Sequence, residues 1–314
     1  MLNLVYAIDD NYNIQTAISI KSFAENTNTK INIFILHKNK KSFNTYYDLL
    51  IQEQNIQQIY VFEFNNKGLN FPRIEGTHIS EATYYRLYLN KYLPKDLKEI
   101  IYIDGDVMLI KNIDNEIGSL FEKLKKSNFT IAAKTDEFRS ENQDIPWDEI
   151  GMKSDKYFNA GVLFIDYRKW IDNKVSENLQ SRLFEIKDEL FFWDQDVLNS
   201  YFDGNYFELE NSYNFRVGLD SKHSISDIGK NAFLIHYQGS WKPWSVRGCY
   251  EKNSIFYQRI YKKLNLGNYH LEHSWRIGSL ISFLAGIFKF KFMNLDYPYL
   301  FAKEFLISLS SNRN

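Results

Sequence analysis

Cysteine is nearly absent from this sequence of 314 residues, which contains only Cys249. An intramolecular disulfide is therefore excluded, and such sparing use of cysteine is typical of a reducing compartment. A secretion signal is also lacking, because the N-terminus has no basic leader and its apolar stretch, residues 2–8, is short and interrupted by Asn3. These absences predict a cytoplasmic protein.

Excess charge of one sign is missing as well. Lys and Arg number 38, Asp and Glu number 39, and the formal net charge is −1. Proteins that bind long polyanions normally carry a positive field that attracts them. We therefore expect no nucleic acid among the partners. The hydrophobic fraction of 44% is ordinary for a globular protein that buries a core.

The first two-thirds of the chain alternates between short apolar runs and amphipathic stretches. This alternation predicts an α/β fold in which a mostly parallel sheet carries helices on both faces. In such sheets ligands lie beyond the carboxyl ends of the strands. No repeat or low-complexity linker interrupts residues 1–265, which we expect to form one domain. Strands are predicted over residues 2–8, 31–37, 58–64, 99–103, 129–133, 158–165 and 233–236, and helices over 14–26, 42–54, 80–92 and 167–187.

Residues 266–314 form a different segment, an amphipathic and aromatic tail. The tail is too short and too interrupted to cross a bilayer, which requires roughly 20 apolar residues. Two interpretations are open: its apolar face packs against the main domain, or it lies in a membrane surface or against a partner. The residues at helical spacing on this face are Ile277, Leu280, Ile281, Leu284, Phe288 and Phe292.

Two acidic residues follow the buried strand predicted over residues 99–103. Asp104 and Asp106 are two positions apart, so in an extended chain both carboxylates point to the same side. Gly105 between them leaves the backbone open to a ligand. Carboxylate oxygens suit Mg²⁺ or Mn²⁺, ions that hold phosphates in this way. The pattern alone is weak, because residues 194–196 repeat it, but its place at a strand end favours a metal site.

His236 ends the late strand predicted over residues 233–236. A lone histidine after an apolar run is ordinarily a hydrogen-bonded core residue, but as a ligand its nitrogen would favour Mn²⁺ over Mg²⁺. In the following loop, Gly239 permits close approach of the backbone. Lys242 supplies a charge suited to a diphosphate, although a solvated loop lysine is the simpler interpretation.

The segment 7–12, AIDDNY, lies at the carboxyl end of the first predicted strand. Uracil presents an N–H group between two carbonyls, so an acidic acceptor beside an amide donor can recognise it. A simple turn with a capping Asp or Asn is the alternative. A sugar-phosphate nucleotidyltransferase would need a glycine-rich phosphate loop here, and residues 8–12 contain no glycine.

Together these segments resemble glycosyltransferase family 8, the retaining GT-A enzymes that include glycogenin and bacterial lipopolysaccharide galactosyl- and glucosyltransferases. The resemblance spans roughly residues 2–244. It implies a GT-A fold followed by a helical tail, and a UDP-sugar donor bound with Mn²⁺, or with Mg²⁺ as the alternative. The motifs, in order, are AIDDNY at 7–12, HIS to YYRL over 78–87, YIDGD at 102–106, FNAGVL at 158–163, DQDVLN at 194–199, and HY at 236–237 with KPW at 242–244.

The resemblance also implies a role for each matching position. The residues that would read the uridine are Ala7, Asp9 and Asn11. The metal ligands would be Asp104, Asp106 and His236. Other contacts to the donor would come from Arg86, Gly105, Asn159, Ala160, Gly239 and Lys242. The residues at the reacting face would be Gln195, which is nearest to it, Asp194, and Asp136 on the acceptor side.

The implied reaction moves glucose or galactose onto an acceptor hydroxyl with retention of configuration. A covalent intermediate would require a carboxylate beneath the anomeric carbon, and that position holds Gln195, with Asp194 beside it. We therefore expect attack on the face from which UDP departs. The expected acceptor is a cell-surface glycan or lipopolysaccharide-type lipid. A protein side chain, or the chain itself, is the alternative acceptor, and a non-catalytic sugar-nucleotide-binding protein is a further alternative.

Overall fold

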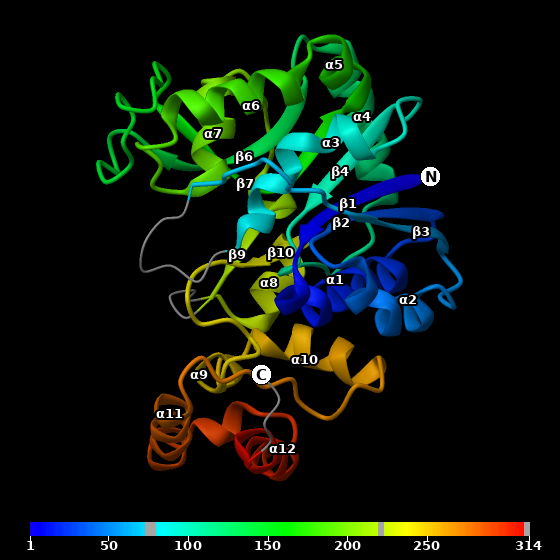
Figure 1. Cartoon of the computed structure of the whole chain (residues 1–314). Helices are drawn as coiled ribbons and strands as arrows, with labels where there is room; N and C mark the ends of the chain where they lie inside the picture. The colour runs from blue at the N-terminus through cyan, green and yellow to red at the C-terminus, as the bar shows by residue number, and fades with distance from the viewer. Residues whose placement is uncertain (73–79, 219–222, 311–314) are drawn as a thin grey trace.

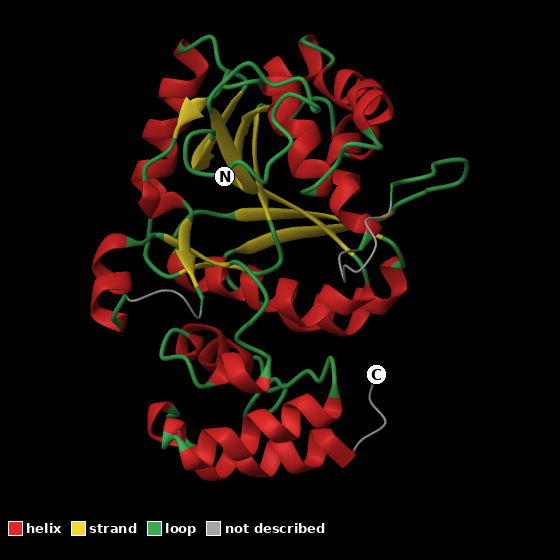
Figure 2. Ribbon diagram, turned by 90° about the vertical axis from the view of Figure 1, so that its left-hand side faces the viewer, coloured by secondary structure: helices red, strands yellow, loops and turns green. Residues whose placement is uncertain are grey.

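The computed structural model describes residues 1–72, 80–218 and 223–310. A seven-stranded sheet in the order β3-β2-β1-β4-β7-β6-β8 lies beside a three-stranded sheet in the order β5-β10-β9 (Figures 1 and 2). The strands are β1 (Leu2–Ile8), β2 (Ile31–His37), β3 (Ile56–Glu63), β4 (Glu99–Ile103), β5 (Val107–Leu109), β6 (Ile131–Phe138), β7 (Lys156–Asp166), β8 (Phe207–Glu208), β9 (Phe215–Val217) and β10 (Leu234–Tyr237).

Helices occupy both faces of the large sheet, as the alternating pattern predicts. The α-helices are α1 (Asn13–Asn26), α2 (Asn44–Leu50), α3 (Leu89–Tyr92), α4 (Asp114–Lys126), α5 (Tyr167–Asp172), α6 (Val175–Ile186), α7 (Trp193–Phe202), α8 (Ile225–Asn231), α9 (Val246–Cys249), α10 (Ser254–Lys263), α11 (Arg276–Phe288) and α12 (Pro298–Ser310). The 3₁₀ helices are η1 (Asp10–Tyr12), η2 (Lys40–Phe43), η3 (Glu81–Tyr88), η4 (Asn211–Tyr213) and η5 (Lys291–Asn294).

The central strands are buried on both sides because alternate residues enter two separate cores. In β4, Ile101 and Ile103 pack with α1, α4 and α10, whereas Ile100 and Tyr102 pack with η3, α5, α6 and α7. This is the pattern expected when successive side chains of a strand point to opposite faces. The helices on the two faces therefore hold the strands, and with them the ends of the strands, in place.

The mostly parallel sheet is confirmed, with one antiparallel strand. Strands β3, β2, β1 and β4 run parallel, whereas β7 is antiparallel to both of its neighbours, β4 and β6. A buried apolar run reads the same in either direction, so the sequence of β7 does not reveal its direction. The reversal brings the start of β7 to the carboxyl end of β4, where the acidic pair lies.

Two predicted helices differ from the structure, one in where it starts and the other in its helix type. Ser42 does not open a helix: it lies inside η2, and α2 begins only at Asn44. Ser80 does cap the helix that follows, because its side chain accepts a hydrogen bond from the Ala82 amide. That helix runs as the 3₁₀ helix η3 for eight residues before α3 begins.

The tail forms two helices, α11 and α12, which lie side by side at the bottom of both views (Figures 1 and 2). Phe283 of α11 stacks on Phe305 of α12 with ring centroids 4.1 Å apart, and Gly286 lies against the ring of Tyr250. None of the helices within the described ranges has the length and apolar character needed to cross a membrane.

Most of the apolar face predicted for the tail does not pack against the main domain. Phe292 does so, lying 5.5 Å from the Tyr250 ring by centroids. The packing interpretation is wrong for the other five residues, because helix α11 turns its Phe283 and Gly286 side toward the body of the protein. The residues left between 40 and 81% exposed are Ile277, Leu280, Ile281, Leu284 and Phe288.

Candidate functional site

A cavity of about 500 Å³ opens beyond the carboxyl ends of β1 and β4. All the residues to which the sequence assigned a role line it, whereas His78 and Ile79 of the second motif lie outside the described residues. The assigned residues are Ala7, Asp9, Asn11, Arg86, Asp104, Gly105, Asp106, Asp136, Asn159, Ala160, Asp194, Gln195, His236, Gly239 and Lys242. Segments distant in sequence therefore share one cavity.

The acidic pair lies in the turn that joins the two sheets. The Asp104 amide donates to the Gly161 carbonyl at 2.9 Å, which extends the pairing of β4 with β7, and β5 begins directly after Asp106 at Val107. Within the small sheet, Val107 is paired with His236 of β10. The turn and this pairing bring His236 beside the two carboxylates, although 130 residues separate it from Asp106 (236 − 106).

The donor atoms of Asp104, Asp106 and His236 suit a divalent ion. Their ligand atoms lie within 4.8 Å of one another, and two oxygens with one nitrogen form a set that Mn²⁺ and Mg²⁺ accept. Gly161 leaves the necessary space: a Cβ there would overlap the His236 ring and lie 2.9 Å from Asp104 Oδ2. The arrangement therefore fits a metal held by these three side chains.

The space beside Gly105 has a different use from the one its sequence position suggests. A Cβ on Gly105 would lie 2.8 Å from Thr16 Oγ1 and 3.1 Å from a ring carbon of Tyr12, so α1 and η1 fill that side. The bare position allows the acidic turn to pack closely on α1, while the residue also lines the cavity. Gly239 has a φ of +83°, and no atom lies within 4 Å of the place where a Cβ would be. Glycine is therefore favoured there by the left-handed backbone conformation and not by lack of space.

Asp106 is buried between Lys242 and His236. Its Oδ2 accepts from Lys242 Nζ at 2.6 Å, and its Oδ1 lies 3.3 Å from His236 Nε2. Burial opposes ionisation, but the charge of Lys242 and then the interaction with His236 outweigh it and lower the pKa of Asp106 below its ordinary value. The carboxylate is thus kept ionised, which is the form that binds a metal.

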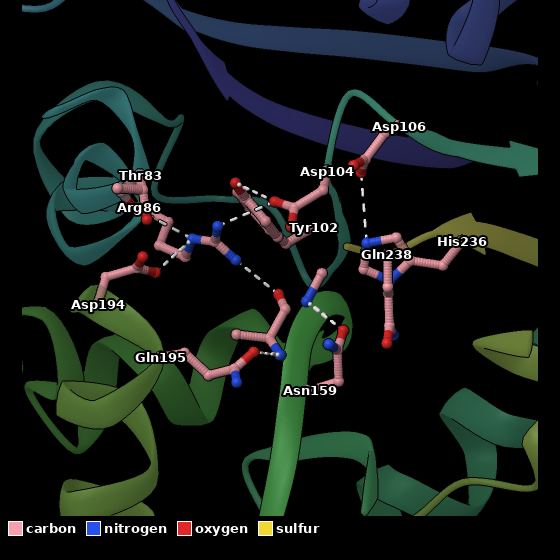
Figure 3. A network of polar contacts seen from close by, with 12 residues as sticks. Thr83, Arg86, Tyr102, Asp104, Asp106, Asn159, Asp194, Gln195, His236 and Gln238 are labelled. Atoms are coloured by element: carbon pink, nitrogen blue, oxygen red, sulfur yellow. Dashed lines mark hydrogen bonds and ion pairs between the residues drawn. The ribbon is translucent and has the colours of Figure 1, made fainter. Parts of the chain in front are cut away.

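Arg86 connects the candidate metal site to a part of the cavity lining that we call the inner wall (Figure 3). The inner wall is formed by Asn159, Ala160, Asp194 and Gln195. Its guanidinium lies 2.9 Å from Asp104 Oδ1 and 2.8 Å from Asp194 Oδ2, and it also donates to the Ala160 carbonyl at 2.6 Å. The group stacks over the ring of Tyr102 at 4.1 Å, and the Tyr102 hydroxyl donates to Asp104 Oδ1 at 3.0 Å. One buried arginine therefore orients two carboxylates at once.

Two consecutive backbone amides of β7 orient the amide side chains of the site. The Ala160 amide donates to Gln195 Oε1 and the Gly161 amide donates to Asn159 Oδ1, each at 2.9 Å (Figure 3). The carbonyl oxygen of Gln195 is thereby engaged by the backbone. Gln195 is held in place from β7 although it is carried by α7.

The capping alternative for the first motif is confirmed. Asp9 caps η1, because its Oδ1 accepts from the Asn11 amide at 2.9 Å. Both side chains also line the cavity, so capping holds the acidic group at the cavity wall. Asp136, which also lines the cavity, has its Oδ1 3.3 Å from Lys134 Nζ.

Several residues of the site carry no role in the sequence patterns. Tyr102 stands within a motif, but its contact with Arg86 depends on the fold. Arg216 and Gln238 line the cavity from β9 and from the residue after β10, and Asn214 contacts His236 from behind. These three lie on or beside short strands whose sequence signal is weak, and no spacing links them to the acidic pair.

Asp194 gives a pH-dependent prediction. Burial is the main cause that raises its pKa from 3.8 to about 7, and Asp104 adds to it, although Arg86 opposes the shift. Between those values the unfolded chain has lost the proton that the folded protein retains, so stability falls as pH rises from about 4 to 7. The free energy of unfolding of the wild type, measured in urea relative to that of Asp194→Asn, should fall by on the order of a few kcal/mol over this pH range. A difference that stays flat with pH would contradict this.

Gly161 gives a prediction for metal binding. Gly161→Ala should displace His236 or Asp104 and weaken Mn²⁺ binding by roughly tenfold or more, measured by isothermal titration. Gly229→Ala is the control, because a Cβ on that residue of α8 meets no atom within 4 Å. Equal affinity of the two variants would show that the three donor atoms do not hold the ion together.

Comparison with known proteins agrees with this geometry. The sequence model described as Glycosyl transferase family 8 matches residues 3–247. The lipopolysaccharide 1,2-glucosyltransferase of Escherichia coli K12 is 28% identical over 279 residues, which cover 82% of this chain and 77% of that protein. Glycosyltransferase GlyF of Streptococcus pneumoniae serotype 4 is 25% identical over 281 residues, which cover 87% of this chain and 64% of that protein.

A solved structure shares the fold. The galactosyltransferase LgtC, in complex with donor and acceptor sugar analogs, aligns with a TM-score of 0.66 and 25% identity, covering 88% of this chain and 100% of that one. The family match includes the turn with Asp104 and Asp106 and the strand β10 with His236, which carry the donor atoms of the candidate metal site. The chain belongs to glycosyltransferase family 8.

Proposed function

We propose that this glycosyltransferase moves glucose or galactose from a UDP-sugar to an acceptor hydroxyl, depends on a divalent metal, and retains anomeric configuration. The observation that carries the proposal is the convergence of Asp104, Asp106 and His236 in a cavity that also holds Lys242 and Arg86. Mn²⁺ is the expected ion because one donor is an imidazole, and Mg²⁺ is the alternative.

Different residues would bind different parts of the donor. Asp104, Asp106 and His236 would hold the ion, which when bound supplies Lewis-acid stabilisation of the departing diphosphate. Lys242 lies beside Asp106, and its ammonium group would stabilise the negative charge of the departing diphosphate. At the far end of the cavity, Asp9, with Ala7 and Asn11, would receive the uracil.

The orientation of the inner wall favours attack on the face from which UDP leaves. Gln195 is a poor nucleophile, and its carbonyl oxygen already accepts from the Ala160 amide. Asp194 is paired with Arg86, so its carboxylate is not presented as an unengaged nucleophile. In this proposal Gln195 and Asp194 orient the donor sugar, and Asp136 lies on the acceptor side.

The acceptor is proposed to be a lipopolysaccharide-type or other cell-surface glycan. The name of the Escherichia coli relative supports this class. Transfer to a protein side chain, or to the chain itself, is the second candidate. A non-catalytic sugar-nucleotide binder is less well supported, because the three donor atoms and their buried partners are all in place.

The tail is proposed to contact a membrane surface, with residues 1–265 forming the transferase domain and 266–314 the attachment in a cytoplasmic, peripheral enzyme. The outer face of α11 presents Ile281, Leu284 and Phe288 to solvent. Lys289, which follows α11 and is exposed, suits anionic headgroups, as does the exposed Lys303 of α12. An amphipathic helix of this kind lies in the membrane interface without crossing it.

The metal assignment predicts the effect of a charge-neutral substitution. Asp106→Asn should lower the rate of UDP release from UDP-glucose and UDP-galactose by roughly 100-fold or more with Mn²⁺ present. Far-UV circular dichroism should remain unchanged. Asp188→Asn, which changes an exposed carboxylate, is the control. Wild-type turnover in Asp106→Asn would contradict the assignment.

The same assay should separate the two metals. Mn²⁺ should support faster turnover than Mg²⁺ in the wild type, and His236→Ala should lower the rate with Mn²⁺. A His236→Ala rate equal to that of the wild type would show that the imidazole is not a ligand.

The membrane proposal predicts the effect of a triple substitution on α11. Changing Ile281, Leu284 and Phe288 to Gln should lower sedimentation with phosphatidylglycerol vesicles at least about tenfold, because each large apolar side chain contributes on the order of 1–2 kcal/mol. Transfer to a soluble acceptor should be unchanged. A control triple variant changes exposed residues of the same types elsewhere, namely Leu49, Phe184 and Ile225. Equal sedimentation of both variants would contradict membrane contact by α11.

A further inference from the structure

Asn214 is a fully buried residue that lies behind the site and touches two of its members. It stands between η4 and β9, next to the strand that pairs with β10, and its side chain has 0% relative exposure. Its Oδ1 lies 2.9 Å from His236 Nδ1, and its Nδ2 donates to Asn159 Oδ1 at 2.9 Å. The residue thus connects the histidine of the metal site with the wall of the donor cavity.

The orientation of this amide follows from a backbone group. The Gly161 amide can only donate, so the Asn159 atom that faces it at 2.9 Å must be the oxygen. The same oxygen faces Asn214, which must therefore present its NH₂ group there. The other end of the Asn214 amide is then the carbonyl oxygen, and this oxygen faces the ring of His236. This chain of hydrogen bonds, from Gly161 through Asn159 to Asn214, allows no other assignment of the oxygen and nitrogen atoms of the two amides.

The tautomer of His236 follows in turn. Opposite a carbonyl oxygen, Nδ1 must carry a hydrogen, so the lone pair of the neutral ring is on Nε2. Nε2 is the nitrogen on the Asp106 side, 3.3 Å from Oδ1. A cation between Nε2 and the carboxylates satisfies all of these groups at once.

Gln238 is the competing partner of the ring. Its Nε2 lies 3.2 Å from His236 Nδ1, farther than the Asn214 oxygen at 2.9 Å. A donor there would favour the opposite tautomer. Gln238, however, is only partly buried, and no described backbone group fixes which end of its amide faces the ring, so it can rotate to present its oxygen. Asn214 cannot rotate its amide in this way, because Gly161 and Asn159 fix its orientation.

We propose that Asn214 is a positioning residue for metal binding: it fixes the Nδ1–H tautomer and the plane of the His236 ring, so that Nε2 faces Asp104 and Asp106. This inference rests on the proposed metal-dependent function. Hydrogen bonds behind a ligating histidine commonly change metal affinity by about 10–100-fold. Because Asn214 also contacts Asn159, it aligns the metal site with the donor-sugar wall.

Two substitutions at this position separate positioning from simple packing. Asn214→Leu keeps the volume but removes the acceptor for Nδ1–H, and should weaken Mn²⁺ binding in the presence of UDP at least about tenfold. Asn214→Asp keeps an acceptor for Nδ1–H and should remain within about threefold of the wild type. It should nevertheless raise KM for the UDP-sugar, because the new carboxylate repels Asn159 Oδ1. Isothermal titration measures the affinity.

Asn253→Leu is the matched control, because Asn253 is also buried and its side chain donates to the Gly218 carbonyl rather than to a residue of the candidate metal site. It should keep wild-type Mn²⁺ affinity. Thermal unfolding of each variant without metal shows whether it folds. In the Mg²⁺–UDP complex, ¹⁵N NMR should place a proton on Nδ1 of His236 in the wild type and in Asn214→Asp.

The outcomes distinguish the two proposals. If the folded wild type binds no Mn²⁺, the metal-dependent function fails, and this inference fails with it. If the wild type binds Mn²⁺ and Asn214→Leu binds it equally well, only the positioning role is overturned. The same conclusion follows if Asn214→Asp loses as much affinity as Asn214→Leu, or if NMR places the proton on Nε2.

Discussion

The structure depends on the junction where β4 leaves the large sheet and β5 enters the small one. Three residues, Asp104 to Asp106, span this junction, and β10 supplies His236 opposite Val107. Bringing a buried carboxylate, Asp106, beside the partly buried Asp104 is costly unless positive charge compensates them. Lys242 and Arg86 provide that compensation on either side. The fold thus holds a group of donor atoms that a divalent cation would complete.

Backbone groups, rather than long side chains, set the finer geometry of the site. Consecutive amides of β7 orient Gln195 and Asn159, and through Asn159 they also determine how Asn214 faces His236. Because these amides belong to a strand buried between two cores, they are held rigidly. Gly161 in the same strand leaves the space into which the His236 ring fits. A single strand therefore supports both the proposed donor-sugar wall and the candidate metal ligands.

The sequence predicts those parts of the site whose signal is local. Asp104 and Asp106 follow a clear apolar strand, and the motifs at strand ends identify the lining of the cavity. The three-residue strands β5 and β9 escape detection because they exist only through pairing with β10. The direction of β7 and the role of Asn214 depend on contacts between distant segments. The exposed face of α11 has the periodicity of a packed helix, and only the position of Phe283 shows which side is buried.

The central claim is that Asp104, Asp106 and His236 bind one divalent ion beside the diphosphate of the donor. The most direct measurement is the anomalous difference density of a crystal grown with Mn²⁺ and UDP. The account predicts one strong manganese peak within about 2.3 Å of an oxygen of each carboxylate and of His236 Nε2, in contact with the diphosphate. Bound UDP with no peak among these atoms, or a peak coordinated by other residues, would contradict it.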